Sequence, residues 1–218
     1  MRGRKLIKVI FFLLALFSLV LLACEKNKFP LGPNRASNYY YYSDGRKIEL
    51  KLVVNELSVG FINSASEGQI QELIQQYGLS IISKVSLTTN QYLLGAPQGG
   101  NTDEFYTRYG DCSVSGFGNE PVVTYSCPVF NGSDGTKMLL TDEFIVKFDS
   151  TITQEEVEML NAGHQVEIVQ IDPLMEGGYV LKATKVSERN ALDMANFYYE
   201  LSITLYGHPN WGMFINFP

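Results

Sequence analysis

The sequence contains few of the residues on which enzyme and metal chemistry most often depends. Among its 218 residues there are two histidines, His164 and His208, and three cysteines. A zinc site needs cysteine and histidine ligands at close spacing, and a serine-type triad needs a nucleophile with an oriented base. Neither arrangement occurs, and no glycine-rich turn has the setting that phosphate binding requires. We therefore predict that the protein is not an enzyme and has no cofactor or metal site.

An excess of positive charge is also missing. The formal net charge is -6, and it becomes more negative if the basic N-terminal segment is removed. A surface that binds nucleic acid is strongly basic, because it must neutralise phosphates. We therefore expect no nucleic-acid partner.

Long hydrophobic runs are absent except for one near the N-terminus. This run extends from Val9 to Leu22, and Ser18 is its only polar residue. It is about fourteen residues long, whereas a membrane-spanning helix needs roughly twenty. A basic segment precedes it, with Arg2, Arg4, Lys5 and Lys8. Together these features predict a cleaved secretory signal peptide over residues 1–23.

The end of this run, Leu21-Leu22-Ala23-Cys24, resembles the lipobox of bacterial lipoproteins. The resemblance implies that Cys24 is acylated and becomes the first residue of the mature chain. A lipoprotein carries two or three acyl chains, which anchor it stably to a membrane. The alternatives are an uncleaved anchor and an incidental cysteine. We expect the protein in the bacterial cell envelope, at the outer membrane, with the face undetermined.

Residues 24–37 are polar and contain Pro30, Gly32 and Pro33, which is typical of a tether. The two cysteines beyond it, Cys112 and Cys127, form an even pair. In an oxidising compartment such a pair predicts a disulfide that closes a short loop, worth roughly 3 kcal/mol. The alternative is two free thiols.

The chain repeats itself at an offset of 87 residues. Residues 54–96 align without a gap with residues 141–183, and nine of the forty-three positions are identical, where chance gives roughly two or three. After a length change, residues 123–128 correspond to residues 204–209. We interpret this as an internal duplication. The alternative is two unrelated βα units with a similar apolar pattern.

In the second copy the patterns predict six elements in the order βαββαβ. Thr153 and Glu156 form a capping box that starts the first helix, and Ser187 is the expected cap of the second helix. The expected strands are residues 143–148, 165–171, 179–183 and 201–206. We expect Gly207 and Pro209 to end the last strand.

This element order packs as an antiparallel four-stranded sheet with two helices on one face, the ferredoxin-like layout. The fold class is therefore α+β, with tandem ferredoxin-like domains of which the first is degenerate. The first domain covers residues 38–136 and opens with strands at 39–42 and 47–54. Ser66 and Gln69 cap its first helix, and its second helix, near 102–109, is weak. The second domain covers residues 137–212, and residues 213–218 form a C-terminal tail.

The second copy resembles the N-terminal propeptide of subtilisin-like serine proteases, particularly the fervidolysin-like kind. The resemblance covers about 75 residues and includes the segments Asp142-Glu143-Phe144-Ile145-Val146-Lys147-Phe148, Gly178-Tyr179-Val180-Leu181, Ala191 to Glu200 and His208-Pro209-Asn210-Trp211. The tyrosine-rich opening also looks like that of exported lipoproteins from Bacteroides-type bacteria. Because the sequence continues only to Pro218, we expect no catalytic domain of the kind that follows such a propeptide.

The resemblance implies a mechanism and a partner. Such a propeptide packs its sheet on a subtilisin-like protease, and its tail enters the active-site cleft as an extended strand. Here the tail is residues 209–218, and strand addition would place Phe214, Ile215, Asn216 and Phe217 in the subsites. Asp172 and Glu176 would lie at helix N-termini of the protease, where the helix dipole favours negative charge.

Two functions follow for this sequence. The first is a non-catalytic envelope lipoprotein that inhibits a serine protease or assists its folding. The second is a lipid-anchored structural or protein-interaction scaffold without a protease partner, since fold does not determine function. The plainer interpretation of the proposed site residues is a loose chain end and two solvated turn acids.

Overall fold

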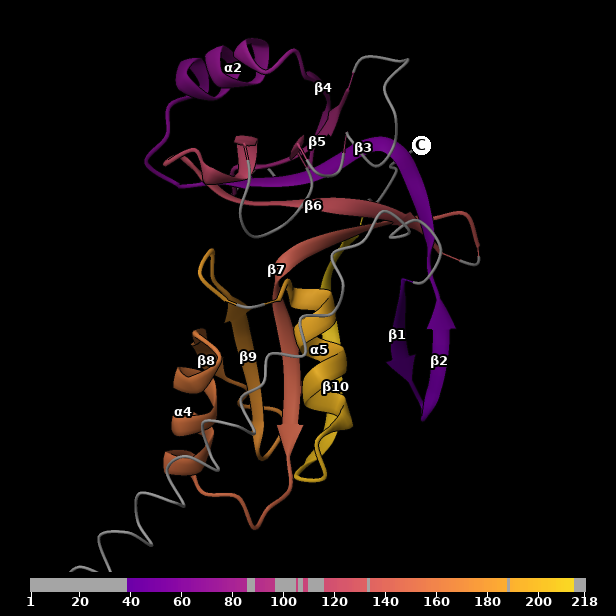
Figure 1. The fold of residues 1–218 in the computed structure, drawn as a ribbon, viewed down its shortest axis with the longest axis vertical. Coiled ribbons are helices and arrows are strands. Elements are labelled where there is room, and N and C mark those ends of the chain that lie inside the picture. The colour runs from indigo at the N-terminus through magenta and orange to yellow at the C-terminus, as the bar shows by residue number, and fades with distance from the viewer. Residues whose placement is uncertain are drawn as a thin grey trace, which may run out of the picture. The chain divides into compact units, whose positions relative to one another are not determined.

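The protein has an α+β fold, as predicted. The structure is a computed structural model that describes residues 39–85, 89–96, 105, 108–109, 116–132, 134–187 and 189–213. These residues belong to one compact unit, Arg35–Pro218. They contain three α-helices, a two-stranded sheet and a larger, antiparallel sheet (Figure 1).

A short hairpin precedes the main sheet. It consists of β1 (Tyr40–Ser43) and β2 (Arg46–Glu49), joined by the tight turn that the sequence predicts. The expected second strand, residues 47–54, is divided at Leu50, because the Leu50 N–H bonds to the Tyr39 carbonyl at 2.8 Å and its side chain is buried. β3 therefore begins only at Lys51.

In the first half of the fold, the described residues form the helix α2 and four strands, and most of the weak second helix expected near residues 102–109 lies outside them. The elements of this half are β3 (Lys51–Phe61), α2 (Glu67–Gln76), β4 (Ser80–Lys84), β5 (Gln91–Gly95), the 3-10 helix η3 (Gly116–Asn119) and β6 (Val123–Asn131). The strands lie in the order β4-β5-β3-β6, and each neighbouring pair is antiparallel. The predicted capping box of Ser66 and Gln69 starts α2.

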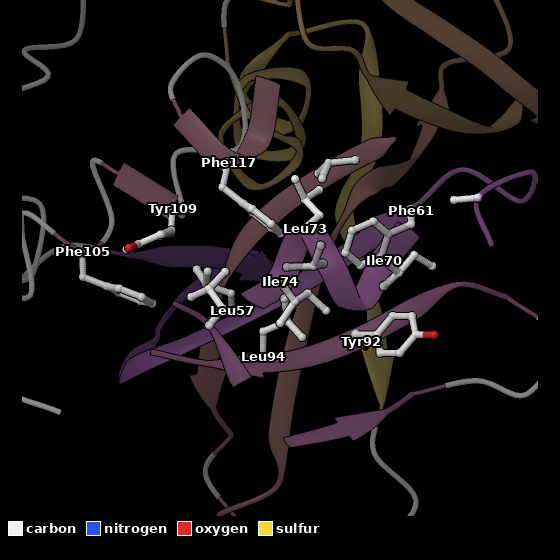
Figure 2. Packing of buried hydrophobic residues seen from close by; sticks show 14 residues of the cluster. Leu57, Phe61, Ile70, Leu73, Ile74, Tyr92, Leu94, Phe105, Tyr109 and Phe117 are labelled. Atoms are coloured by element: carbon white, nitrogen blue, oxygen red, sulfur yellow. The ribbon is translucent and has the colours of Figure 1, made fainter. Parts of the chain in front are cut away.

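The core of the first half lies between α2 and one face of these strands. Ile70, Leu73 and Ile74 of α2 point toward Leu57 and Leu94 of the sheet (Figure 2). All five side chains are buried. Complete burial of a side chain of this size stabilises the fold by about 1.5–3 kcal/mol, and this holds α2 on the sheet.

The second half contains two α-helices and four strands. Its elements are β7 (Lys137–Phe148), α4 (Gln154–Gly163), β8 (Val166–Ile171), β9 (Gly178–Ala183), α5 (Ala191–Glu200) and β10 (Thr204–Met213). β7 pairs with β9 and β10, and β8 pairs with β9, all antiparallel. The predicted capping box of Thr153 and Glu156 starts α4.

Aligned positions of the two halves adopt the same elements. The helices α2 and α4 begin at Glu67 and Gln154, and the strands β5 and β9 begin at Gln91 and Gly178. Both pairs have the offset of 87 residues found in the sequence. The outer strands β4 and β8 also carry register shifts at equivalent places, so that Ile82 and Val169 each lack a partner in the register.

The second helix of the second half begins later than predicted. Asn190, not Ser187, is the N-cap of α5, and its side chain accepts a hydrogen bond from the Asp193 N–H at 3.0 Å. Ser187 is buried and donates to the Gln165 carbonyl at 2.6 Å. The prediction was wrong because a serine that has a partner in a neighbouring loop does not cap a helix.

The last strand also differs from the prediction, which ended it at residue 206. β10 continues to Met213 and pairs with β7 as far as Met138. Gly207 is needed inside the strand, because a Cβ there would lie 2.6 Å from the Ala195 carbonyl oxygen of α5. Pro209 is tolerated because β10 is bonded on one side only. The part of the expected tail from Pro209 to Met213 is therefore sheet.

Candidate functional site

Most of the residues named as site residues from the sequence lie outside the described part of the chain. These are Cys24, Cys112 and the tail residues Phe214, Ile215, Asn216 and Phe217. Cys127 is described: it lies in β6, is completely buried and is disulfide-bonded. Its pairing with Cys112 stays a prediction.

The two acidic residues named from the sequence lie in the turn between β8 and β9. Asp172 accepts a hydrogen bond from the Leu174 N–H at 2.8 Å, so its carboxylate orders the turn. Glu176 is exposed and lines a hollow of about 380 Å³ together with Lys147. Because Met213 pairs with the opposite end of β7, the structure separates these acids from the start of the tail by about 30 Å of strand.

Both histidines contact aromatic rings. His164 caps the C-terminus of α4, and its ring lies 4.7 Å from the ring of Phe197. His208 lies within β10, where its Nδ1 is 2.8 Å from the Pro209 carbonyl oxygen. Burial lowers the pKa of His208, which favours the neutral imidazole at neutral pH. Its ring stacks on Tyr206 and contacts the ring of Tyr41 edge-on.

The two helices of the second half cover the same face of its sheet. Val157 of α4 and Ala195 of α5 belong to one buried cluster with Phe144 and Val146 of β7. Successive side chains of a strand point to opposite faces, so Ile145 lies on the other face. We call this other face the open face, because no described helix of the second half packs on it.

Three rows of side chains cross the open face. Residues directly opposite each other in an antiparallel pair share a face, which assigns the members of each row. The middle row consists of Gln170, Val180, Ile145 and His208, from β8, β9, β7 and β10. The charged row consists of Glu167, Lys182 and Glu143, and it is extended by Asn210, which donates to Glu143 at 2.9 Å. The third row consists of Lys147 and Tyr206.

The open face is partly accessible to solvent. Ile145 and Val180, the aliphatic members of the middle row, are half-buried, whereas Gln170 and Glu167 on the outer strand are exposed. An accessible apolar centre with a polar rim is typical of a protein-binding surface.

The corresponding face of the first half is buried. Its residues Ser58 of β3, Leu93 of β5 and Cys127 of β6 are each at most 2% exposed. Cys127 belongs to a cluster with Leu192 of α5 and Leu50, so the second half and the hairpin region cover this face. A Cβ on Gly60 would collide with the ring of Tyr125, which shows how closely the side chains pack here.

An ion pair lies at the charged row. Lys182 Nζ is 3.0 Å from Asp142 Oδ2, and the side chains are 31% and 12% exposed. Burial raises the pKa of the Asp142 carboxyl in spite of the nearby Lys182 ammonium. Burial by itself would lower the pKa of Lys182. The neighbouring carboxylates, of which Asp142 has the largest effect, outweigh the effect of burial and raise this pKa. Lys182 is therefore charged at neutral pH and compensates several acids.

Replacing Lys182 with methionine is expected to destabilise the fold in a pH-dependent way. At pH 7 the Asp142 carboxylate loses its partner, and we expect about 2 kcal/mol of lost stability, less than for a fully buried pair because Lys182 is partly solvated. The pKa of Asp142 is already raised in the folded state, so the cost of its charge disappears as the pH falls below about 3.9, the unfolded value. The loss should therefore be small near pH 3. Urea unfolding at both pH values measures it.

A double variant separates charge from packing. Asp142→Asn places at position 142 the residue found at the equivalent position 55 of the first half. Combined with Lys182→Met, it should recover most of the stability lost at pH 7 by Lys182→Met alone. An equal loss at pH 3 and pH 7 in the single variant would contradict the ionic explanation and indicate lost packing of the lysine stem.

The open-face residues were not identified from the sequence. The signal was present, since Glu143, Ile145 and Lys147 alternate with the apolar residues of β7, as do Val180 and Lys182 in β9. Strand alternation shows that the side chains of such residues point away from the core. It does not show whether another element covers them, because that depends on distant segments.

No protein-family model matches the chain, and no curated protein or solved structure matches it either. Within the described ranges, no helix is long and apolar enough to cross a membrane. The same residues contain no group of three acidic, histidine or cysteine side chains that could hold a metal ion. We therefore infer function from the side chains of the open face.

Proposed function

We propose that this chain is a non-catalytic protein-binding lipoprotein of the bacterial envelope that docks its partner on the open face of the second half. One observation carries the proposal: Ile145 and Val180 of the middle row are only half-buried, while the equivalent face of the first half is buried. Lipid on Cys24 would hold the binding surface at the membrane.

The finer description of the fold is part of this proposal: each half is a ferredoxin-like unit. Two observations support it. The strand order β4-β5-β3-β6 corresponds element by element to β8-β9-β7 with β10 on the far side of β7. In the second half, α4 and α5 follow the first and third strands and pack on one face, which is the arrangement of that layout.

For the partner, we favour a subtilisin-like protease that is inhibited or assisted in folding. The support is the resemblance of the second half to protease propeptides, together with the path of the chain. β10 ends at Met213, so five residues follow it, including Phe214 and Phe217. Five extended residues reach at most about 17 Å, which is long enough to occupy several subsites of a cleft beside the docked sheet.

The docking test compares a variant of the open face with a variant of the exposed side of α4. The chain from residue 25 onward should inhibit at least one member of a panel of purified subtilisin-like proteases at micromolar concentration. Changing Ile145 and Val180 together to aspartate should weaken inhibition at least tenfold, because two charges would be desolvated at the centre of the interface. Met159→Asp is the matched control, since Met159 is 70% exposed on α4, away from the open face.

Removing residues 214–218 separates the tail from the sheet. If the tail occupies the cleft, the truncated chain should still bind the protease in surface plasmon resonance but lose inhibition. If the open-face variant inhibits as well as the wild type, docking through this face is refuted. A panel without any inhibited protease removes the protease as partner and leaves the scaffold function.

The scaffold alternative has its own test on the full chain in its host. A photo-crosslinking amino acid at position 145 should trap a neighbour that the same group at position 159 does not trap. A trapped protease supports the inhibitor function, and another envelope protein supports the scaffold. Identical adducts from both positions, or none, would contradict a binding role for the open face.

A further inference from the structure

Positive charge is concentrated in the part of the chain that follows the predicted leader most closely. Residues 25–51 contain six lysines and arginines and three acids, whereas residues 52–218 contain seven and twenty. The helices α2, α4 and α5 contain acids but no lysine or arginine. The charge of the protein is therefore strongly asymmetric, with a positive N-terminal region and a negative remainder.

The hairpin of β1 and β2 displays part of this positive charge. All four residues of β2 are exposed, and β2 pairs with β1 alone among the described strands. Arg46 and Lys47 lie in β2, and the exposed Lys51 follows at the start of β3. The other exposed cations in the described ranges are Lys84 and Arg108. Three of these five cations thus lie within six residues.

The strand β1 attaches the hairpin to the second half. The ring of Tyr42 stacks on the ring of Tyr199 of α5, with the centroids 4.2 Å apart, and its hydroxyl donates to Glu200 at 2.7 Å. Asn196 of α5 donates to the Tyr40 carbonyl oxygen at 2.8 Å. The fold therefore fixes the position of β2, while the side chains of β2 stay in solvent.

The hairpin combines its cations with amphipathic rings. Lys47 Nζ lies 4.2 Å from the centroid of the Tyr40 ring and 5.5 Å from that of the Tyr42 ring, and Ile48 beside it is 37% exposed. Tyrosine, lysine and arginine are suited to the headgroup region of a bilayer, because each has an apolar body and a polar tip. This composition indicates a surface that contacts lipid headgroups.

The segment before the hairpin limits its distance from a membrane that holds Cys24. Fourteen residues, 25–38, separate Cys24 from Tyr39, and they reach at most about 50 Å when fully extended. The hairpin is the first described element after them. Exposed cations that come within a Debye length of an anionic bilayer, about 8–10 Å, are attracted to it, whereas acidic helices are repelled.

We infer that this basic hairpin, residues 40–51 with the cations Arg46, Lys47 and Lys51, binds the surface of an anionic bilayer and orients the fold on it. The inference rests on the lipid anchor of the proposed function, which brings the hairpin to the membrane. Repulsion of α2, α4 and α5 disfavours orientations in which these helices face the headgroups. The anchored protein then presents its open face to a partner in one orientation.

Fluorescence quenching on vesicles tests the inference with the chain from residue 25 onward. An N-terminal histidine tag on a nickel-chelating lipid replaces the acyl anchor, so the test does not depend on lipidation of Cys24. The fluorophore NBD is attached to Ile48→Cys or, as the control, to Met159→Cys on α4, and a lipid with a nitroxide headgroup is the quencher. When about 30% phosphatidylglycerol is added to phosphatidylcholine vesicles, quenching at position 48 should rise at least twofold, and quenching at position 159 should not rise. The rise should disappear at about 1 M salt.

Matched charge reversals locate the contact. Arg46→Glu combined with Lys51→Glu should abolish the rise in quenching at position 48. Lys84→Glu combined with Arg108→Glu makes the same change of net charge at exposed positions of the first half and should leave the rise intact. An equal loss in the two double variants would overturn the inference, because net charge alone would then explain the attraction.

The outcomes separate this inference from the proposed function. If quenching at position 48 does not rise on anionic vesicles, or rises equally at positions 48 and 159, the hairpin does not recognise the bilayer and the inference is refuted. The docking test uses no membrane, so the proposed function survives that result. A rise confined to position 48, together with no specific crosslink from position 145, keeps the membrane contact and removes the docking function.

Discussion

Cys24→Ala is expected to abolish lipid attachment completely. The Cys24 thiol is the atom that would carry the diacylglycerol, and no other side chain of the lipobox-like Leu-Leu-Ala-Cys segment can form the thioether. Without that modification the leader would remain uncleaved, so the product would keep residues 1–23. Metabolic labelling with an alkyne fatty acid measures the lipid, and intact mass measures the leader. We expect full labelling of the wild type and none of the variant.

The other cysteines provide the control for this experiment. Cys112→Ala should keep the lipid label, because this cysteine is expected in a disulfide with Cys127, the residue that the structure shows disulfide-bonded. Label that persists in Cys24→Ala, or that is absent from the wild type, would contradict the assignment of the N-terminus. The open-face proposals do not depend on that outcome, since residues 35–218 form a compact unit.

Phe144→Ala is expected to cause the largest loss of stability, about 3–5 kcal/mol. Phe144 is completely buried, and its ring lies 5.3 Å from the ring of Tyr198 of α5. Truncation leaves a cavity between β7 and both helices of the second half, which form one cluster with it. Since small domains are stable by only about 5–15 kcal/mol, chemical unfolding followed by circular dichroism should show a much lower midpoint.

Its neighbour in sequence is the matched control. Ile145 lies on the open face and is half-buried, so Ile145→Ala should cost no more than about 1.5 kcal/mol. The equivalent core residue of the first half is Leu57, also 0% exposed, and Leu57→Ala should cost about 2–5 kcal/mol. Similar losses for positions 144 and 145 would contradict the assignment of the two faces.

The sequence predicted the elements of the second half well where their signals are local. The capping box of Thr153 and Glu156 is confirmed, because its hydrogen bonds join residues three positions apart. The strand β9 starts one residue before its predicted start, since Gly177 and Gly178 mark the end of the turn and the apolar residues Tyr179, Val180 and Leu181 follow. The repeat helped as well, because each half provided a second example of the same pattern.

The predictions were wrong where a contact with a residue distant in the sequence determines where an element begins or ends. Pro209 was expected to end a strand, but it pairs opposite Phe144, more than sixty residues earlier. Ser187 was expected to cap a helix, but the Gln165 carbonyl is its partner. In both cases the local preference is correct, and a tertiary contact outweighs it.

The sequence alone determined the class of the fold, the repeat and the inward-facing positions, because periodicity and capping depend on neighbours along the chain. The tertiary structure decided which sheet face is available. Cys127 and Ile145 are both strand residues that point away from their own helices, yet one is fully buried and the other only half-buried. The difference is that side chains of distant elements, among them Leu192 of α5 and Leu50, form one buried cluster with Cys127, and side-chain alternation within a strand contains no information about such a contact.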